Sequence, residues 1–415
     1  TPPSPISSRV SLIDELMELT AQSINHLEIQ ERFNVIKEIG RGKYGKVLLV
    51  THRCRGTPMA LKVMPKASTK LQGFLREYCI SLHLSCHPCI VGLFGIAFQS
   101  KEHYCFAQEL VIGRDLFAVI QPKVGIPESS VKRCALQVAS ALEFIHSHGL
   151  VHRDIKPENI LLLDSHCQQV KLADFGLAQK RGTMIRFITG TLPYMAPELC
   201  SMALLDGQRE VTAPPLSVEP SLDTWAFGVV IFCILTGYFP WDRCMDSDDF
   251  YQEFAGWCRM EQRSYTEKDI PPLWKKFTPE AMEMFGKLLA LDARDRFSVG
   301  EVRGYMEMEW MKKTYFFSPS FIGRCLINKY SIWVISQNIN KEKMNSLFSL
   351  HWVICRIKQN KTVIHCVYND YTTQNTRRSQ VTGDWSEGLM GSSPRELCSF
   401  FTCFICIDQP MQYDG

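Results

Sequence analysis

The sequence lacks the features that mark membrane, zinc-binding and disulfide-bonded proteins. None of its apolar runs reaches the roughly 18 residues that a transmembrane helix needs, so we expect no membrane span. The 17 cysteines are scattered, and no two Cys-x-x-Cys pairs follow each other at the spacing of a zinc site. Unpaired cysteines in a chain of this length are typical of a reducing compartment, so we expect the cytoplasm or the nucleus.

Charge of one sign is also scarce. The net charge of +3 is too small to indicate nucleic acid or an acidic membrane surface as a partner. No signal peptide is visible, and the sequence begins at Thr1 rather than at a methionine, which leaves its natural start open. With 46% hydrophobic and 21% charged residues, the 415-residue chain has ordinary globular composition and is long enough for two lobes and a tail.

One stretch carries most of the chemical information. It runs from Val151 to Asn159, reads VHRDIKPEN, and is followed by Asp174-Phe175-Gly176. Phosphoryl transfer needs such a set: one carboxylate to orient a hydroxyl nucleophile, a second carboxylate with an amide to hold Mg²⁺, and a cation to neutralise phosphate oxygens. The alternative is a chance loop with a structural aspartate. The residue order and the second motif together argue against that alternative.

These motifs resemble the catalytic loop and metal-binding motif of eukaryotic protein kinases, and the resemblance extends over about residues 32–312. It implies an α+β, bilobal protein kinase fold, with a small β-rich N-lobe at about 32–109 and a larger, mostly helical C-lobe at about 110–312. The Lys-Pro-Glu-Asn at 156–159 is typical of serine/threonine kinases. The resemblance therefore implies a monomeric kinase domain that uses ATP and Mg²⁺ to phosphorylate protein Ser/Thr hydroxyls.

The resemblance also implies two groups of ATP-binding residues. The glycine loop and its flanks supply the first group: Ile39, Gly40, Arg41, Gly42, Lys43, Tyr44, Gly45 and Val47. Strand-like sequence follows this G-x-G-x-x-G, which favours a kinase over a dinucleotide-binding fold. The second group would surround adenine and ribose: Ala60, Lys62, Gln108, Glu109, Val111, Asp115 and Leu161. Asp115 has three open interpretations: a ribose contact, a contact with a basic substrate residue, or an N-cap.

Catalytic and metal-binding roles follow from the same resemblance. The catalytic set is Asp154, Lys156, Lys62, Glu77 and Thr191. Asp154 would orient the substrate hydroxyl, Lys156 would contact the γ-phosphate, and Thr191 would bond both side chains. Lys62 would hold the α- and β-phosphates with Glu77 as its partner, although Glu77 could instead form an ordinary surface pair. Asn159 and Asp174 would bind Mg²⁺, which prefers hard oxygen ligands.

The activation segment, from Asp174 to Glu198, has an unusual sequence for a regulated kinase. Phe187 stands where many such kinases carry a phosphorylated threonine, and the loop hydroxyls before Thr191 are Thr183 and Thr189. We therefore expect activity that does not depend on a phosphate in this segment. The residues between the segment and Asp223 include several prolines and predict an insertion loop.

Five shorter motifs resemble the SH3-binding-domain kinase family. They are Phe74-Leu75-Arg76-Glu77, Phe106-Ala107-Gln108-Glu109, Gly113-Arg114-Asp115-Leu116-Phe117, Val131-Lys132-Arg133-Cys134 and Trp225-Ala226-Phe227-Gly228-Val229. Kinases of that family are Ser/Thr-specific, and the family name derives from proline-rich tails. Residues 321–393 contain no proline, so SH3 binding is not carried over. The rival function is a pseudokinase or scaffold that acts by binding proteins. The presence of every catalytic residue type argues against this rival.

The two ends of the chain lie outside the resemblance. Residues 1–31 predict a flexible arm followed by a short amphipathic helix from about residue 12, which packs on the next lobe or engages a partner. Residues 313–415 have no clear hydrophobic period, and we expect this tail to be disordered. Its apolar segment 397–407 is too short to span a bilayer.

Overall fold

The computed structural model describes residues 12–42, 45–186, 190–206, 215–260, 265 and 268–313, and the backbone of strands between 324 and 383. The chain divides between residues 312 and 313 into two compact units, each described here by itself. Several positions that the sequence singled out lie outside the described residues: Lys43, Tyr44, Phe187, Thr189 and the segment 397–407. Within the described part, none of the helices combines the length and hydrophobicity that crossing a bilayer requires.

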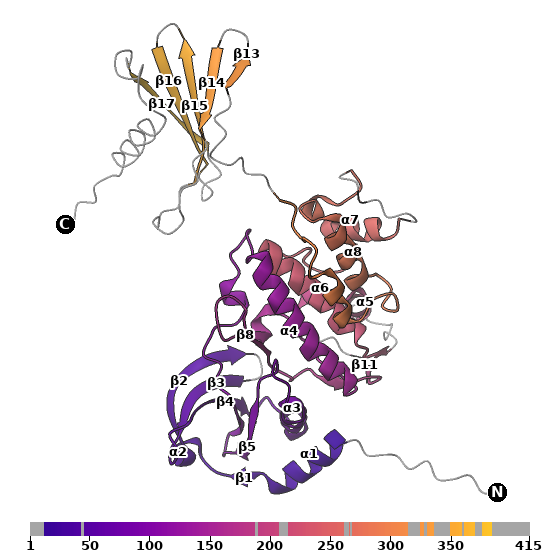
Figure 1. Cartoon of the computed structure of the whole chain (residues 1–415). Helices are drawn as coiled ribbons and strands as arrows, with labels where there is room; N and C mark the ends of the chain where they lie inside the picture. The colour runs from indigo at the N-terminus through magenta and orange to yellow at the C-terminus, as the bar shows by residue number, and fades with distance from the viewer. Residues whose placement is uncertain are drawn as a thin grey trace, which may run out of the picture. The chain divides into compact units, whose positions relative to one another are not determined.

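The first unit begins with a six-stranded sheet in the order β1-β5-β6-β4-β3-β2 (Figure 1). Its strands are β1 (Asn25–His26), β2 (Phe33–Gly42), β3 (Gly45–His52), β4 (Pro58–Pro65), β5 (Leu93–Gln99) and β6 (His103–Gln108). The short helix α2 (Ile29–Arg32) precedes β2. Phe33, Val50, Leu61 and Phe98 are buried together on one side of the sheet, as expected for strands rich in β-branched and aromatic residues. The hairpin β2–β3 carries the glycine loop.

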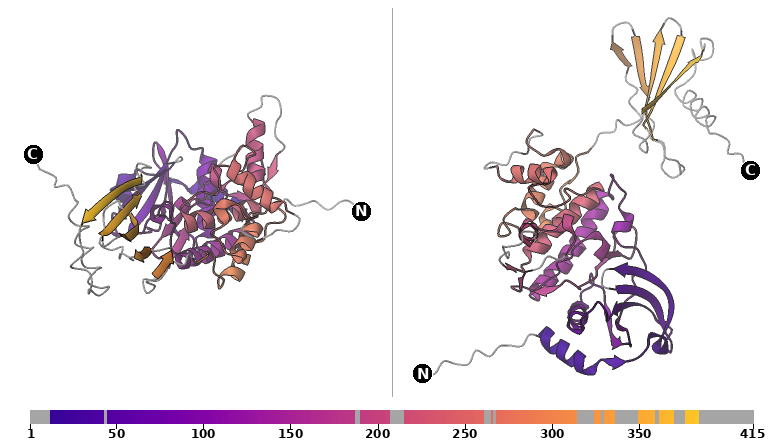
Figure 2. Two further views of the ribbon diagram at one scale, coloured as in Figure 1. Left: turned by 90° about the horizontal axis from the view of Figure 1, so that it is seen from above. Right: turned by 180° about the vertical axis from the view of Figure 1, so that it is seen from behind.

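Two helices accompany this sheet. Helix α3 (Leu71–Leu84) follows β4, and helix α1 (Leu12–Ser23) lies beside α3 at the N-terminal end of the unit (Figure 2). The amphipathic helix that the sequence predicts from about residue 12 is therefore present, and it packs on the β-rich lobe. The N-terminal lobe thus consists of one sheet, α3 and the added helix α1.

The C-terminal lobe is mostly helical. Its helices are α4 (Glu128–Ser147), α5 (Pro197–Asp206), α6 (Ser221–Thr236), α7 (Asp249–Cys258) and α8 (Pro279–Leu288). Every residue of α6 from Leu222 to Thr236 is buried, as expected for a helix whose sequence is apolar on nearly every face. Gly237 ends α6 with φ of 70°, and a Cβ there would lie 2.4 Å from the carbonyl oxygen of Gln121, so only glycine fits.

Short strands and 3₁₀ turns connect these helices. The strands are β7 (Leu150–Val151), β8 (Ile160–Leu162), β9 (Val170–Leu172), β10 (Gln179–Lys180), β11 (Met184–Ile185) and β12 (Leu216–Ser217). The 3₁₀ turns are η1 (Phe117–Val119), η2 (Pro157–Asn159), η3 (Leu192–Tyr194), η4 (Pro272–Trp274) and η5 (Val299–Tyr305). Strand β8 pairs with β9, β10 with β7, and β11 with β12. The end of the predicted insertion, β12, thus pairs with the activation segment.

The second unit contains a five-stranded antiparallel sheet in the order β13-β14-β15-β16-β17. The strands are β13 (Arg324–Ile327), β14 (Tyr330–Ile335), β15 (Ser349–Lys358), β16 (Lys361–Asn369) and β17 (Thr376–Gly383). Our expectation of disorder for residues 313–415 stays a prediction outside these strands. The strands are rich in β-branched and aromatic residues and contain no proline, so the backbones of neighbouring strands can pair along the sheet. A register shift between Leu350 and Trp352 obscures the alternation in the sequence.

Candidate active site

The loop after β7 is held by one buried carboxylate. Asp223, at the start of α6, has no solvent exposure, and its two oxygens accept hydrogen bonds from the backbone N–H groups of His152 and Arg153, both at 2.8 Å. The Nε2 atom of His146 lies 2.8 Å from the same carboxylate. Arg153 has φ of 68°, a strained conformation for a residue with a side chain, and the bonds to Asp223 stabilise it.

The stability of the protein in acid should depend on Asp223. Burial by itself would raise the pKa of this carboxyl, but hydrogen bonds and charge from His146, His152 and the Arg153 N–H hold it below its ordinary value. Because the folded-state pKa lies below the unfolded value of about 3.9, the ionised group adds stability at neutral pH, and this contribution is lost as pH falls through the folded-state pKa.

We therefore expect Asp223→Asn to lower the free energy of unfolding by about 2 kcal/mol at neutral pH and by less below about pH 4. Urea unfolding of both proteins between neutral pH and about pH 3 measures this difference. Identical pH dependence in the two proteins would contradict this account of Asp223.

The loop presents a cluster of functional side chains next to this anchor. Lys156 Nζ donates to Asp154 Oδ2 at 2.7 Å, and Asn159 Nδ2 donates to the same oxygen at 2.9 Å and to the Asp154 carbonyl at 2.8 Å. The Asn159 carbonyl in turn accepts from the backbone N–H of Ala173 at 2.9 Å. The loop and the residue before Asp174 are therefore fixed to each other, and one carboxylate oxygen faces both a cation and an amide.

A second cluster joins the sheet of the N-lobe to the same place. Lys62 on β4 and Glu77 on α3 form an ion pair, with 9% and 3% of each residue exposed, and Lys62 Nζ also lies 3.0 Å from Asp174 Oδ1. Burial by itself would lower the pKa of Lys62, but the two carboxylates raise it above its ordinary value, so the lysine stays charged. The Glu77 side chain is thus buried against Lys62 and does not form a surface pair.

Asp174 is oriented by its neighbours. Its backbone has φ of 63°, and its Oδ1 accepts from Gly176 N at 3.2 Å as well as from Lys62. Partial burial would raise the pKa of this carboxyl, yet Lys62 holds it below the ordinary value, so it is ionised. Phe175 is buried, and its ring centroid lies 4.9 Å from that of His152 in the catalytic loop. The phenylalanine thus anchors the turn that aims Asp174.

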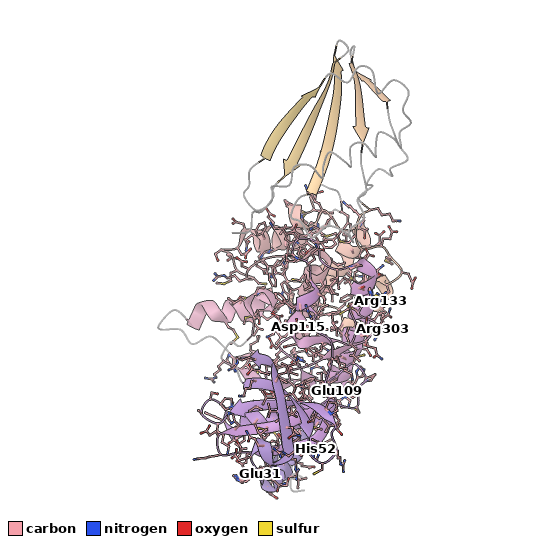
Figure 3. All side chains as sticks on the ribbon, turned by 90° about the vertical axis from the view of Figure 1, so that its left-hand side faces the viewer. Glu31, His52, Glu109, Asp115, Arg133 and Arg303 are labelled. Atoms are coloured by element: carbon pink, nitrogen blue, oxygen red, sulfur yellow. The ribbon has the colours of Figure 1, made fainter. Side chains whose placement is uncertain are left out.

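The connection between the lobes exposes backbone where adenine would bind. Glu109, labelled at the junction in Figure 3, turns its side chain to Gly92 N at 2.6 Å and to Lys171 Nζ at 2.7 Å. Its own N–H donates to the Gly92 carbonyl at 2.8 Å.

Asp115, also labelled in Figure 3, accepts from Ala118 N at 2.9 Å, so it serves as a cap for the turn η1. The structure shows the cap, and contacts of Asp115 with ribose or with a basic substrate residue stay predictions.

The glycine hairpin and the floor of the same region complete the site. Gly45 has φ of 155°, and a Cβ there would lie 2.3 Å from the Val63 carbonyl, so the hairpin needs glycine at this position. Val47 pairs with Lys62 across β3 and β4, and Ala60 pairs with Gln108 across β4 and β6. The other predicted members stand as follows: Ile39 is exposed, Gly42 has open space around it, Arg41 pairs with Glu38 at 2.7 Å, and Val111 and Leu161 are half-buried.

Comparisons with known proteins address this arrangement directly. The family model of the protein kinase domain matches residues 33–311. The chain belongs to the protein kinase family. Serine/threonine-protein kinase SBK1 of Danio rerio is 49% identical over 74% of this chain and 76% of its own length. Serine/threonine-protein kinase SBK2 is 45% identical in Mus musculus and 44% in Homo sapiens, over 72% of this chain and 80% and 84% of those proteins. These relatives confirm the predicted membership of the SH3-binding-domain kinase family.

The activation segment of this kinase is tied to the C-lobe core by a buried ion pair. Arg296 Nη1 and Nη2 bond the two oxygens of Glu198 at 2.7 and 2.8 Å, and the arginine side chain is fully buried.

Thr191 does not form the contacts predicted from the sequence. In the described part of the chain its hydroxyl makes no hydrogen bond with Asp154 or Lys156, and those two side chains bond each other. The bridging role of Thr191 stays a prediction.

Several residues that build the kinase site were not identified from the sequence. His146 supports Asp223, and Lys171 holds the Glu109 side chain away from the adenine region. Neither belongs to a motif, and each contacts a partner distant in sequence, so periodicity and spacing carried no signal. His152 lies within the quoted motif, and its Nδ1 accepts from Asp154 N at 3.2 Å, which its position in the loop could have indicated.

Proposed function

We propose that this kinase transfers the γ-phosphate of ATP to serine and threonine hydroxyls of proteins. The observation that supports this most is the convergence of Lys62, Glu77 and Asp174 at the place where the catalytic loop presents Asp154. Charged side chains from four separate segments meet there, and Lys62 pairs with both Glu77 and Asp174. A binding scaffold would gain no stability from gathering charges in this way, since buried ion pairs seldom repay their desolvation.

Asp154 orients the acceptor hydroxyl and takes its proton as the phosphoryl group moves. Asn159 and Lys156 both donate to one Asp154 oxygen, which leaves the second oxygen for the substrate. An ordinary carboxylate is sufficient, because the transition state of phosphoryl transfer is loose and positioning dominates the rate. Lys156, two residues away, contributes positive charge next to the transferred group.

Mg²⁺ fits the oxygen atoms that remain. Asp174 uses Oδ1 for its described hydrogen bonds, and Asn159 uses its amide nitrogen, so in the described residues Asp174 Oδ2 and Asn159 Oδ1 are left without such bonds. Both are hard donors of the kind that Mg²⁺ prefers, and a bound Mg²⁺ would neutralise phosphate charge. Lys62 holds Asp174 in place and offers its own charge to the α- and β-phosphates of the nucleotide.

Adenine binds to backbone rather than to side chains. The Glu109 side chain is occupied by Gly92 and Lys171, so the carbonyl of this residue and the N–H of Val111 remain for the base. Val47 and Leu161 cover the two faces of the ring, and Ala60 leaves room for it. Along with this site, a monomeric kinase domain and a cytoplasmic or nuclear location remain predictions from the sequence.

Phosphate transfer to a generic basic protein tests the proposal. With ATP and Mg²⁺, we expect phosphoserine and phosphothreonine products, and Lys62→Met should lower the rate about a hundredfold because phosphate charge is left uncompensated. Lys66→Met is the matched control, since Lys66 lies past the end of the same strand and pairs with Gln99 instead. Equal background transfer by wild type, Lys62→Met and Lys66→Met would favour the scaffold function.

A further inference from the structure

Helix α1 takes no part in the chemistry above, yet it lies against the helix that carries Glu77 (Figure 2). Ile13 is 7% exposed and belongs to the apolar cluster that includes Ile80 of α3. About two helical turns further along α1, the Thr20 hydroxyl lies 3.6 Å from the Cys79 thiol. A helix of 12 residues is marginally stable by itself, so these contacts hold α1 in place.

The same face of α1 continues onto the apolar cluster of the N-lobe. Leu16, Met17 and Ala21 of α1, and Ile24 just after it, are partly buried and pack against the cluster that contains residues of α3. Leu12 and Leu19 lie at the edge of this packed face and are 54% and 62% exposed. Helix α3 begins after Lys70, which makes no side-chain cap hydrogen bond. The orientation of α3, and with it the position of Glu77, therefore depends on packing, to which α1 contributes.

A second contact links α1 to the activation segment. Asp14 Oδ2 lies 2.5 Å from Lys180 Nζ, and the two side chains are 50% and 42% exposed. Lys180 belongs to β10, which pairs with β7 directly before the catalytic loop. An exposed ion pair of this kind is weak, so the apolar packing of α1 supplies most of the attachment. The ion pair adds a contact between α1 and β10.

The first part of the activation segment is held by protein groups along its described length. Arg181 Nε lies 2.7 Å from Glu219 Oε2, and Gly182 N donates to the Val218 carbonyl at 2.9 Å. Strand β11 then pairs with β12. These contacts hold the activation segment in place, as a phosphate on this segment does in many regulated kinases. This agrees with the phenylalanine, rather than a threonine, at position 187.

We infer that α1 is an intramolecular strap, formed by residues 12–23, that keeps α3 and β10 in the arrangement needed for catalysis without a phosphate on the activation segment. Ile13 and Met17 are positioning residues: they act on the Lys62–Glu77 pair through α3. The inference rests on the proposed function, because its effect is on the rate of phosphoryl transfer.

The test compares two double alanine variants of the full-length protein after phosphatase treatment. Ile13→Ala/Met17→Ala truncates the packed face of α1, and Leu12→Ala/Leu19→Ala truncates two exposed side chains of the same helix. We expect kcat for a basic protein substrate to fall at least about tenfold in the first variant, with KM for ATP within about twofold, and to stay unchanged in the second. Amide hydrogen exchange should accelerate in α3 of the first variant and remain unchanged in α6.

Unchanged kcat and unchanged α3 exchange in Ile13→Ala/Met17→Ala would overturn the strap. Faster exchange in α6 as well would mean that the double variant is unfolding globally, and the Asp14–Lys180 ion pair then provides the test. Asp14→Lys should lower kcat about threefold, and the further change Lys180→Asp should restore it. An Asp14→Lys protein with unchanged kcat would overturn the inference. An inactive wild-type protein would refute the proposed function instead. In that case the exchange of α3 still tests the strap.

Discussion

Replacing Asp154 with asparagine is expected to lower kcat about a thousandfold while leaving the affinity for ATP nearly unchanged. The substitution keeps the shape of the side chain and the bond to Asn159 but removes the group that accepts the hydroxyl proton. It also removes the charge that Lys156 faces at 2.7 Å. Because Asp154 belongs to the catalytic loop and not to the glycine hairpin, nucleotide binding should not need it. Single-turnover phosphate transfer and equilibrium ATP binding together measure the two effects.

Asp164→Asn is the control for this experiment. That carboxylate lies in the exposed turn between β8 and β9 and accepts backbone N–H bonds from His166, Gln168 and Gln169. The same chemical change there should leave kcat within about twofold of wild type, since the turn is outside the site. Asp154→Asn protein with more than about a tenth of wild-type kcat would show that the carboxylate does not take the proton.

Replacing Arg296 with methionine is expected to lower the free energy of unfolding by about 3–5 kcal/mol. The guanidinium is fully buried and bonds Glu198 through both terminal nitrogens, and it also bonds the carbonyls of Ala290 and Ser221 at 2.9 and 3.0 Å. Methionine fills part of the volume but leaves these acceptors and the carboxylate without a donor. The midpoint of thermal unfolding should fall by roughly 10 °C in a calorimetric scan.

Arg294→Met provides a control from the same segment of the chain. Arg294 pairs with Asp292 at 2.6 Å, yet its side chain is 89% exposed, so water replaces the lost contact. We expect a change of less than about 1 kcal/mol for this variant. Equal losses of stability in the two variants would mean that the burial of Arg296 has no energetic consequence.

The contrast between these two arginines shows what the sequence left undecided. Arg294 and Arg296 are two residues apart, and the short stretch that contains them does not indicate that one is buried against Glu198 and the other exposed. Burial depends on where α5, α6 and the segment after α8 meet, and three elements distant in the chain set that position. A pattern within a few residues contains no information of this kind.

Much of the fold and site was nevertheless predictable, because the relevant signals are local. The buried helix α6 follows from a sequence that is apolar on every face, and the catalytic loop places Asp154, Lys156 and Asn159 within a few residues of one another. Side chains so close in sequence must meet when the backbone takes one compact turn. Strand-like sequence on both sides of the glycines likewise predicted a hairpin.

Contacts between distant segments had to come from the tertiary structure. Asp223 is far from the catalytic loop in sequence, and the structure places both of its oxygens on the loop backbone. Asp115 had three possible partners, and the structure shows its bond to the local one, Ala118 N. The tail sheet, which runs in order from β13 to β17, was not foreseen either, because the alternation in its strands is interrupted.

The sequence by itself determined that this chain is a protein kinase with its catalytic residue types in place, since those residues lie in short motifs with few ways to arrange them. Only the tertiary structure decided which carboxylate anchors the loop, which arginine is buried, and that α1 lies on α3. The physical reason is that burial and charge pairing depend on distances between segments far apart along the chain, which packing alone sets.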